Sequence, residues 1–280
     1  MAALACTGVV ACGSSTPAAA PGTGTTPETR APDTRYEVTA TVLDDGDGPK
    51  LCAGGVLTSL PPQCGGPALS GWDWNAVSGF EELGGVRWGE FDLVGTWDGS
   101  TFALTDPPTP ASPSSGDGAG EDAPDFTPPC PEPAEGWPTG STTFEQWQAF
   151  VTAAQEPADL AAFWVYRRGP DNDPNRDVAV VAYTGDVEAH RAALEEIWSG
   201  PLCVVQFERS LNDLRTIQME LSDQATARSL GLYALAASVD ERHQTVVLDV
   251  LVDEPQAQAE LDARYGAGLI VLRPAFTPVT

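Results

Sequence analysis

Cysteines are the residues of this chain whose types and spacing are best suited to chemistry. Cys6 and Cys12 lie in a short apolar segment at the N-terminus, and the remaining four are Cys52, Cys64, Cys130 and Cys203. Four cysteines allow three disulfide connectivities. Because Cys52 and Cys64 enclose a short loop within one β-rich region, we expect them to pair, which leaves Cys130 for Cys203. No C-x-x-C motif is present, so the spacing does not favour a zinc site.

A second group of residues could hold a hard cation. Four oxygen donors stand at alternate positions, as they do at the start of a calcium-binding loop: Asp171, Asp173, Asn175 and Asp177. Two positions depart from such a loop, because Arg176 replaces its glycine and Ala182 replaces its bidentate glutamate. A solvated turn is the alternative, since Asp and Asn are common turn residues. Calcium at these four residues is the one cofactor that the sequence suggests.

Catalytic motifs are missing from the sequence. It has no G-x-S-x-G, S-x-x-K, H-E-x-x-H, P-loop or G-x-G-x-x-G motif. His190 falls on or beside the apolar stripe of an expected helix, and His243 falls in an expected hairpin turn. A structural histidine and a surface histidine are therefore expected, and no catalytic residue is assigned.

Tryptophan is concentrated in one short region, which contains Trp72, Trp74, Trp88 and Trp97. Trp72 and Trp74 would share one face of any strand that they occupy. They either build the core of a small domain, where large rings supply buried area, or form an exposed aromatic shelf for a glycan, peptide or apolar ligand. Trp72 and Trp74 are the candidate ligand-binding residues.

The N-terminus has the pattern of an export signal. Residues 2–11 are small and apolar, and Val9-Val10-Ala11-Cys12 resembles a bacterial lipobox, in which the cysteine is lipidated. Because no basic stretch precedes the apolar residues, we expect the natural start to lie upstream. Residues 1–12 are predicted to be the signal and lipobox, and residues 13–35, rich in Ser, Thr, Pro, Ala and Gly, a disordered tether. The chain would then be anchored at Cys12 to the outer face of the bacterial cell membrane.

The composition limits the partners of the chain. Lys and Arg number 14 against 40 Asp and Glu, so the formal net charge is −26. A chain this acidic repels phosphate backbones, which excludes nucleic acid as a partner and argues against membrane binding through basic patches. The expected partners are the membrane, through the lipid anchor, and an envelope protein, a glycan or a peptide.

Two folded regions are expected after the tether. Residues 36–106 have alternating, β-rich runs, and Asp98-Gly99 between two of them is a hairpin signal. We predict a small all-β domain, an OB-like barrel. Residues 107–135 contain nine prolines and are predicted to be a linker without helix or strand.

Residues 136–280 alternate between helical and strand patterns. Thr142-x-x-Glu145 resembles a capping box at the start of a first helix, and Asp186 and Ser210 are expected to cap two more. From residue 177 the expected order is β-α-β-α-β-β-α-β, with Asp240–Gln244 as a hairpin turn. Right-handed crossovers would place these elements in one mixed sheet, an α+β sandwich of ferredoxin-like kind. The fold class is therefore multi-domain, with an all-β and an α+β part.

The two regions resemble a family of uncharacterised secreted lipoproteins of actinobacteria. The resemblance is carried by Ser59-Leu-Pro-Pro-Gln-Cys-Gly-Gly-Pro67, Gly71-Trp-Asp-Trp74 and Trp198-Ser-Gly-Pro-Leu-Cys203. It implies an envelope location and this two-part architecture, and no activity. Residues 230–275 are also faintly similar to the pro-domains of secreted serine proteases.

The sequence thus favours a lipid-anchored extracytoplasmic envelope protein that acts as a non-catalytic binding or interaction module. One alternative is an extracytoplasmic hydrolase that uses carboxylates, although with 40 acidic residues no pair can be selected. The other alternative, which rests on the pro-domain similarity, is an inhibitor or chaperone of a secreted protease.

Overall fold

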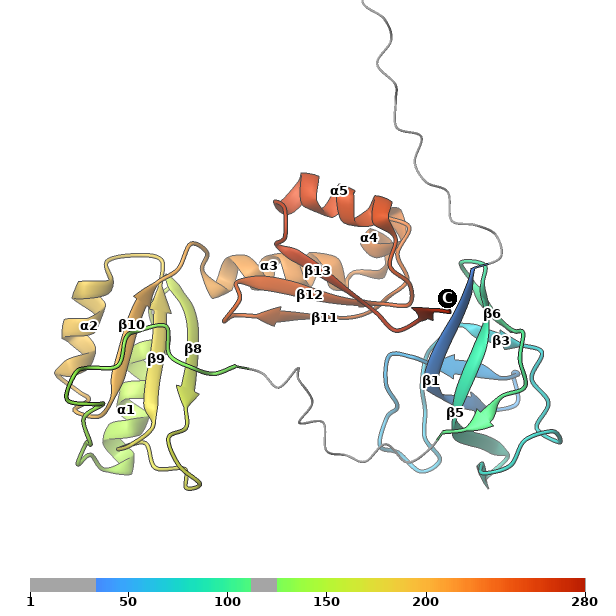
Figure 1. Cartoon of the computed structure of the whole chain (residues 1–280), viewed down its shortest axis with the longest axis horizontal. Coiled ribbons are helices and arrows are strands. Elements are labelled where there is room, and N and C mark those ends of the chain that lie inside the picture. The colour runs from blue at the N-terminus through green and yellow to red at the C-terminus, as the bar shows by residue number, and fades with distance from the viewer. Residues whose placement is uncertain (1–33, 112–124, 280) are drawn as a thin grey trace, which may run out of the picture. The chain divides into compact units, whose positions relative to one another are not determined.

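The computed structural model describes residues 34–111 and 125–279 (Figure 1). The lipobox at Val9–Cys12 and nearly all of the expected tether lie outside the described residues, as does the middle of the expected 107–135 linker. Among the described residues, no helix has both the length and the apolar content needed to cross a membrane.

The N-terminal part of the described chain is a small mixed β-barrel. Five strands build it: β1 (Arg35–Asp44), β2 (Lys50–Cys52), β3 (Ala68–Ser70), β5 (Val86–Trp97) and β6 (Thr101–Leu104). They are hydrogen-bonded in the order β1-β2-β3-β6-β5, and β5 pairs with β1 to close the cycle. The β3–β6 pair is parallel and the other four pairs are antiparallel. The short strands β4 (Glu81–Leu83) and β7 (Thr109–Pro110) lie against β5.

Apolar and polar residues alternate along the barrel strands, and the apolar side chains fill the interior. This is expected for strands with one buried face. Val38, Ala40 and Val42 of β1 point inward, and Phe91 and Leu93 of β5 face them. The predicted hairpin at Asp98-Gly99 is confirmed. There the Asp98 carboxylate accepts hydrogen bonds of 2.8 Å from the backbone N–H groups of Ser100 and Thr101, which also lower its pKa.

Residues from the far end of the sequence complete the barrel core. Phe276 is fully buried and its ring lies 5.0 Å from that of Phe102, 5.9 Å from that of Trp97 and 6.2 Å from that of Tyr36. Leu251 and Val252 belong to the same buried cluster. The last strand, β14 (Thr277–Pro278), pairs with the start of β1. A barrel of this size has little interior of its own, so these distant side chains supply part of its buried apolar surface.

Both predicted disulfides are present, Cys52–Cys64 and Cys130–Cys203. Cys52 ends β2, and the chain returns through Gly65 and Gly66 so closely that the Leu51 backbone N–H donates to the Pro67 carbonyl at 3.0 Å. A Cβ atom on Gly66 would lie 1.9 Å from the Leu51 carbonyl oxygen, whereas one on Gly65 would meet nothing within 4 Å. The close approach explains why a glycine stands at position 66.

The expected 107–135 linker is more structured at its edges than predicted. Thr109 and Pro110 form strand β7, which pairs with Asp92 and Phe91 of β5. The prediction that this segment contains no strand is therefore wrong at this point. Pro110 does not prevent the pairing, because β7 lies at the edge of the sheet, where a missing N–H is tolerated.

The α/β region begins with a three-stranded sheet of order β10-β9-β8. Its strands are β8 (Leu160–Tyr166), β9 (Val178–Tyr183) and β10 (Leu202–Gln206), and its helices are α1 (Phe144–Gln155) and α2 (Val187–Glu195). Ala179, Val181 and Tyr183 of β9 pack with the buried residues of both helices. The alternate residues of β9 pack on the other face, where the Cys130–Cys203 disulfide also lies. One buried strand thus separates two layers.

A second three-stranded sheet follows, of order β11-β12-β13. Its strands are β11 (Ala234–Asp240), β12 (Thr245–Val250) and β13 (Ile270–Pro274), and its helices are α3 (Leu211–Ser222), the short α4 (Gln224–Ser229) and α5 (Pro255–Tyr265). Side chains of all three helices share one core with Val246, Leu248 and Val250 of β12. The predicted hairpin at Asp240–Gln244 joins β11 to β12.

The expectation of one ferredoxin-like sheet after residue 177 is wrong, because the strands divide into two separate sheets. β8 pairs with β9 on the side opposite β10, which uses the second edge of β9. Two of the three buried leucines of α3, Leu214 and Leu221, pack with residues of β11, β12 and β13 and not with β10.

Helix starts were predicted well, with one error of a single residue. Asp186 caps α2 and Ser210 caps α3, as expected. The capping box of α1 consists of Thr143 and Gln146 and not of Thr142 and Glu145. The reason is local, since the Thr142 hydroxyl and backbone N–H both donate to the Asn175 side-chain oxygen at 2.7 Å.

We predict that Gly66→Ala lowers the free energy of unfolding by about 2 kcal/mol or more, because the new methyl group collides with the Leu51 carbonyl. Gly65→Ala is the matched control and should change it by less than about 0.5 kcal/mol. Urea unfolding followed by tryptophan fluorescence measures both. Equal stabilities for the two variants would show that the close approach is not a constraint.

Candidate functional site

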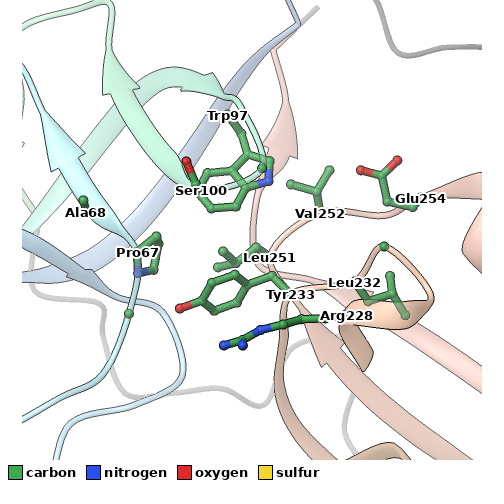
Figure 2. A pocket seen from close by; sticks show the side chains of 13 residues that line it. Pro67, Ala68, Trp97, Ser100, Arg228, Leu232, Tyr233, Leu251, Val252 and Glu254 are labelled. Carbon is green, nitrogen blue, oxygen red and sulfur yellow. The ribbon is translucent and has the colours of Figure 1, made fainter. Parts of the chain in front are cut away.

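A cavity of about 550 Å³ lies where the end of the barrel meets the second sheet (Figure 2). Its walls come from four segments of the sequence, two in the barrel and two in the α/β region. The barrel contributes the β5–β6 turn and the residues that lead into β3, and the α/β region contributes the end of α4 and the residues that follow β12. The side chains used below are Trp97, Ser100, Arg228, Tyr233, Leu251 and Glu254.

Two aromatic rings form the apolar part of the wall. Trp97 ends β5 and is 8 % exposed, and its ring meets that of Tyr233 edge to face at 6.0 Å. Leu251 lies beside both rings in Figure 2 and is fully buried. The edge-to-face arrangement is favourable for aromatic pairs and fixes the orientation of both rings. The two rings make this part of the cavity wall apolar.

Arg228 supplies a positive charge to the cavity wall. Asp223 caps its helix, α4, and the Asp223 carboxylate accepts a hydrogen bond of 2.9 Å from the Thr226 backbone N–H. Ala227 is fully buried in the second core, which leaves the neighbouring Arg228 exposed at the cavity. Gly231 has a φ of 73°, a left-handed conformation that suits glycine, and it turns the chain so that Tyr233 follows on the same wall.

The guanidinium group has no ion-pair partner among the described residues, although acidic residues outnumber basic ones almost threefold. In Figure 2 the Arg228 guanidinium and the Tyr233 hydroxyl extend toward the same side, where Pro67 lies. Glu254 is the one carboxylate among the described residues that line the cavity. A guanidinium beside a phenol can bind a carboxylate or a phosphate group with charge-assisted hydrogen bonds.

The structure places both candidate ligand-binding tryptophans in the barrel core. Trp74 is buried, and its indole N–H donates to the Asp44 carboxylate at 3.1 Å. Trp72 is half-buried and meets the rings of Trp74 and Phe91 edge to face at 5.1 and 4.8 Å. Such packing agrees with the core interpretation, and neither ring lines the cavity described above.

The candidate calcium residues are engaged by protein groups. Asp171 and Asp173 both pair with Arg176, which occupies the glycine position of a calcium loop. Asn175 accepts hydrogen bonds from Thr142, and Asp177 accepts one of 2.9 Å from the Arg168 backbone N–H. Within residues 34–111 and 125–279, no three His, Cys, Asp or Glu side chains gather as a metal site would require. The arrangement is that of a cross-linked turn.

His190 contacts a carboxylate and an aromatic ring. Its Nε2 atom lies 2.9 Å from an Asp159 carboxylate oxygen, and its ring stacks on that of Tyr183 at 3.8 Å. Tyr183 is buried and its hydroxyl donates to the Ala154 carbonyl at 2.8 Å. No described Ser, Thr or Cys side chain hydrogen-bonds to His190, which fits a structural role. His243 is exposed and pairs with Asp240 in the hairpin turn.

No family model matches the chain, and no curated protein matches it.

Sequence reasoning missed this cavity. Trp97 was noticed as one of four clustered tryptophans, and its neighbour Gly99 as part of a hairpin turn. Nothing in the sequence pointed to Arg228 or Tyr233, which lie more than 120 residues later. The available signal was a basic residue in the last turn of a short helix, which is also a common capping position.

We predict that the buried tyrosine makes stability fall at alkaline pH. Burial, followed by the charge of Asp159, raises the pKa of Tyr183 from 10 to about 12. The folded-state pKa is above the unfolded one, so this contribution is complete below about pH 10 and is lost as the pH rises toward about 12.

Tyr183→Phe removes the ionisable group. The unfolding free energy of the variant, measured in urea between about pH 8 and about pH 11, should decrease less than that of the unmodified chain. At neutral pH the variant should be about 1 kcal/mol less stable, because the hydrogen bond to Ala154 is lost. Parallel pH profiles for the two proteins would contradict the assignment.

Proposed function

We propose that this chain is a lipid-anchored extracytoplasmic protein that binds a small organic anion in the cavity at the end of its barrel, without a catalytic step. The observation that carries the binding proposal is the position of Arg228. It is a guanidinium without an ion-pair partner among the described residues, and it lines the same cavity as Trp97 and Tyr233. A ligand with an apolar ring and a carboxylate or phosphate group would match these surfaces.

The location rests on the disulfides and on the N-terminal sequence. Disulfides are typical of proteins that fold outside the cytoplasm, and the two bonds Cys52–Cys64 and Cys130–Cys203 indicate such a compartment. The lipobox-like residues Val9–Cys12 support a lipid on Cys12 as the form of attachment. Membership of the secreted actinobacterial lipoprotein family is part of this proposal, and it rests on the sequence resemblance alone.

We assign the barrel to the OB-like type. An OB-fold is a five-stranded Greek-key barrel whose loops and strand faces bind ligands. The order β1-β2-β3-β6-β5 with a parallel β3–β6 pair and closure through β1–β5 supports this assignment. The β5–β6 turn, with Gly99 and Ser100, is one of the loops that line the proposed site.

The binding proposal predicts a charge-dependent affinity for an aromatic anion. Phenyl phosphate is a suitable probe, with binding measured by calorimetry or by ligand-observed NMR. Arg228→Gln should weaken its affinity by about tenfold or more, since a charge-assisted hydrogen bond is lost. Arg215→Gln is the matched control, because Arg215 is an exposed arginine of α3 that does not line the cavity. Equal affinities of the Arg228 variant and the unmodified chain would refute an anion site at Arg228.

The localisation proposal predicts the mass of the mature chain. Protein purified from the membrane fraction of its own host should begin at Cys12 and carry a diacylglyceryl group. Reduction should add about four daltons, two for each disulfide. Cys12→Ser should move the protein to the soluble fraction and leave the mass gain on reduction unchanged. An unlipidated chain in the membrane fraction would reject the anchor.

A further inference from the structure

A loop closed by a disulfide presents bare aliphatic side chains to solvent. It spans residues 53–63, between Cys52 and Cys64, and we name it the Cys loop. Leu57 is 65 % exposed and Leu60 is 75 % exposed, and Val56 beside them is also exposed. Three exposed large apolar residues within five positions form a patch rather than the scattered apolar residues that ordinary surfaces carry.

The Cys loop has a defined conformation, so the patch is a built feature. The disulfide joins its ends, and the Leu57 backbone N–H donates to the Gln63 carbonyl at 2.8 Å. The Ser59 hydroxyl donates to the Pro61 carbonyl at 2.9 Å. These bonds keep the leucines outside the core, although the barrel interior is a few residues away along the chain.

The charge distribution indicates which kind of surface the patch can bind. Residues 51–72 contain no Asp, Glu, Lys or Arg, in a chain whose net charge is −26. The remainder of the chain is repelled by anionic surfaces, whereas this segment is not. An uncharged aliphatic loop loses no ionic hydration when it enters the boundary between lipid headgroups and acyl chains.

The size of the patch argues against a second copy of the chain as the occupant. A stable protein interface buries roughly 800 Å² on each partner and involves about 20 residues or more. Three side chains are far fewer than this. A bilayer needs no complementary partner surface, so a few inserted aliphatic side chains can bind it.

We propose that the Cys loop docks onto a lipid bilayer by inserting Leu57, Leu60 and Val56 at its surface. The proposal rests in part on the lipid anchor proposed above, which would keep the barrel at the membrane.

Vesicle binding of the full chain with Cys12→Ser, which removes the anchor, tests the loop by itself. The probe is phosphatidylcholine vesicles, and the readout is the partition coefficient from co-sedimentation. Leu57→Ser with Leu60→Ser should lower this coefficient by about tenfold or more. The matched control combines Phe144→Ser and Met219→Ser, two apolar residues of α1 and α3 that are 70 % and 67 % exposed, and it should bind as the parent does.

A second measurement needs no loop variant. Hydrogen exchange of the Cys12→Ser chain should slow within residues 53–63 when vesicles are added. The proposal is overturned if the parent chain does not bind vesicles, if both double variants bind equally well, or if exchange in the loop is unchanged. It is also overturned if sedimentation shows a dimer that only the loop variant loses, since the occupant is then a second copy.

The experiments test the docking proposal and the anchor proposal independently of each other. If Cys12 carries lipid but the Cys12→Ser chain does not bind vesicles, the docking proposal alone is wrong. If Cys12 carries no lipid but vesicle binding depends on the leucines, the anchor is wrong and the docking proposal stands.

Discussion

The contact of Phe276 with the barrel is the interaction that joins the C-terminal end of the chain to the barrel core. The ring is fully buried among Tyr36, Trp97 and Phe102, more than 170 residues away in the sequence. It joins the last strands of the chain to the first ones, and it does so at the end of the barrel where Trp97 lies. The same contact brings Leu251 and Tyr233 against Trp97 and thereby creates the cavity wall. The contacts that pack the barrel core therefore also form the wall of the candidate binding site.

Local patterns predicted the local structure of this chain. Alternation gave the barrel strands, the Asp98-Gly99 pair gave a hairpin, and Asp186 and Ser210 gave two helix starts, because each of these depends on neighbouring residues. The one displaced cap, Thr143 in place of Thr142, shows the limit of such reasoning. Thr142 is bound by Asn175, which lies 33 residues away, and no local pattern contains that contact.

Local patterns could not predict which distant strands and helices pack together. The strand patterns after residue 177 were recognised, yet two sheets formed where one was expected. The division into two sheets has two causes. β8 occupies the second edge of β9, and leucines of α3 pack on the later strands. The candidate site has the same origin, because Arg228 and Trp97 belong to different parts of the fold and line one cavity. The disulfides were the exception, since a cysteine has few partners to choose from.

The pairing of β14 with the start of β1 has a mechanical consequence. Tyr36 and Glu37 lie opposite Pro278 and Thr277, while the whole length of β1 is paired with β5 on its other side. A force transmitted through the N-terminal segment enters the fold at this point. When it is directed along β1, it acts on all the hydrogen bonds of that strand in parallel rather than breaking them one after another. The end of the chain that would face an anchor therefore resists a pull along β1 through many hydrogen bonds at once.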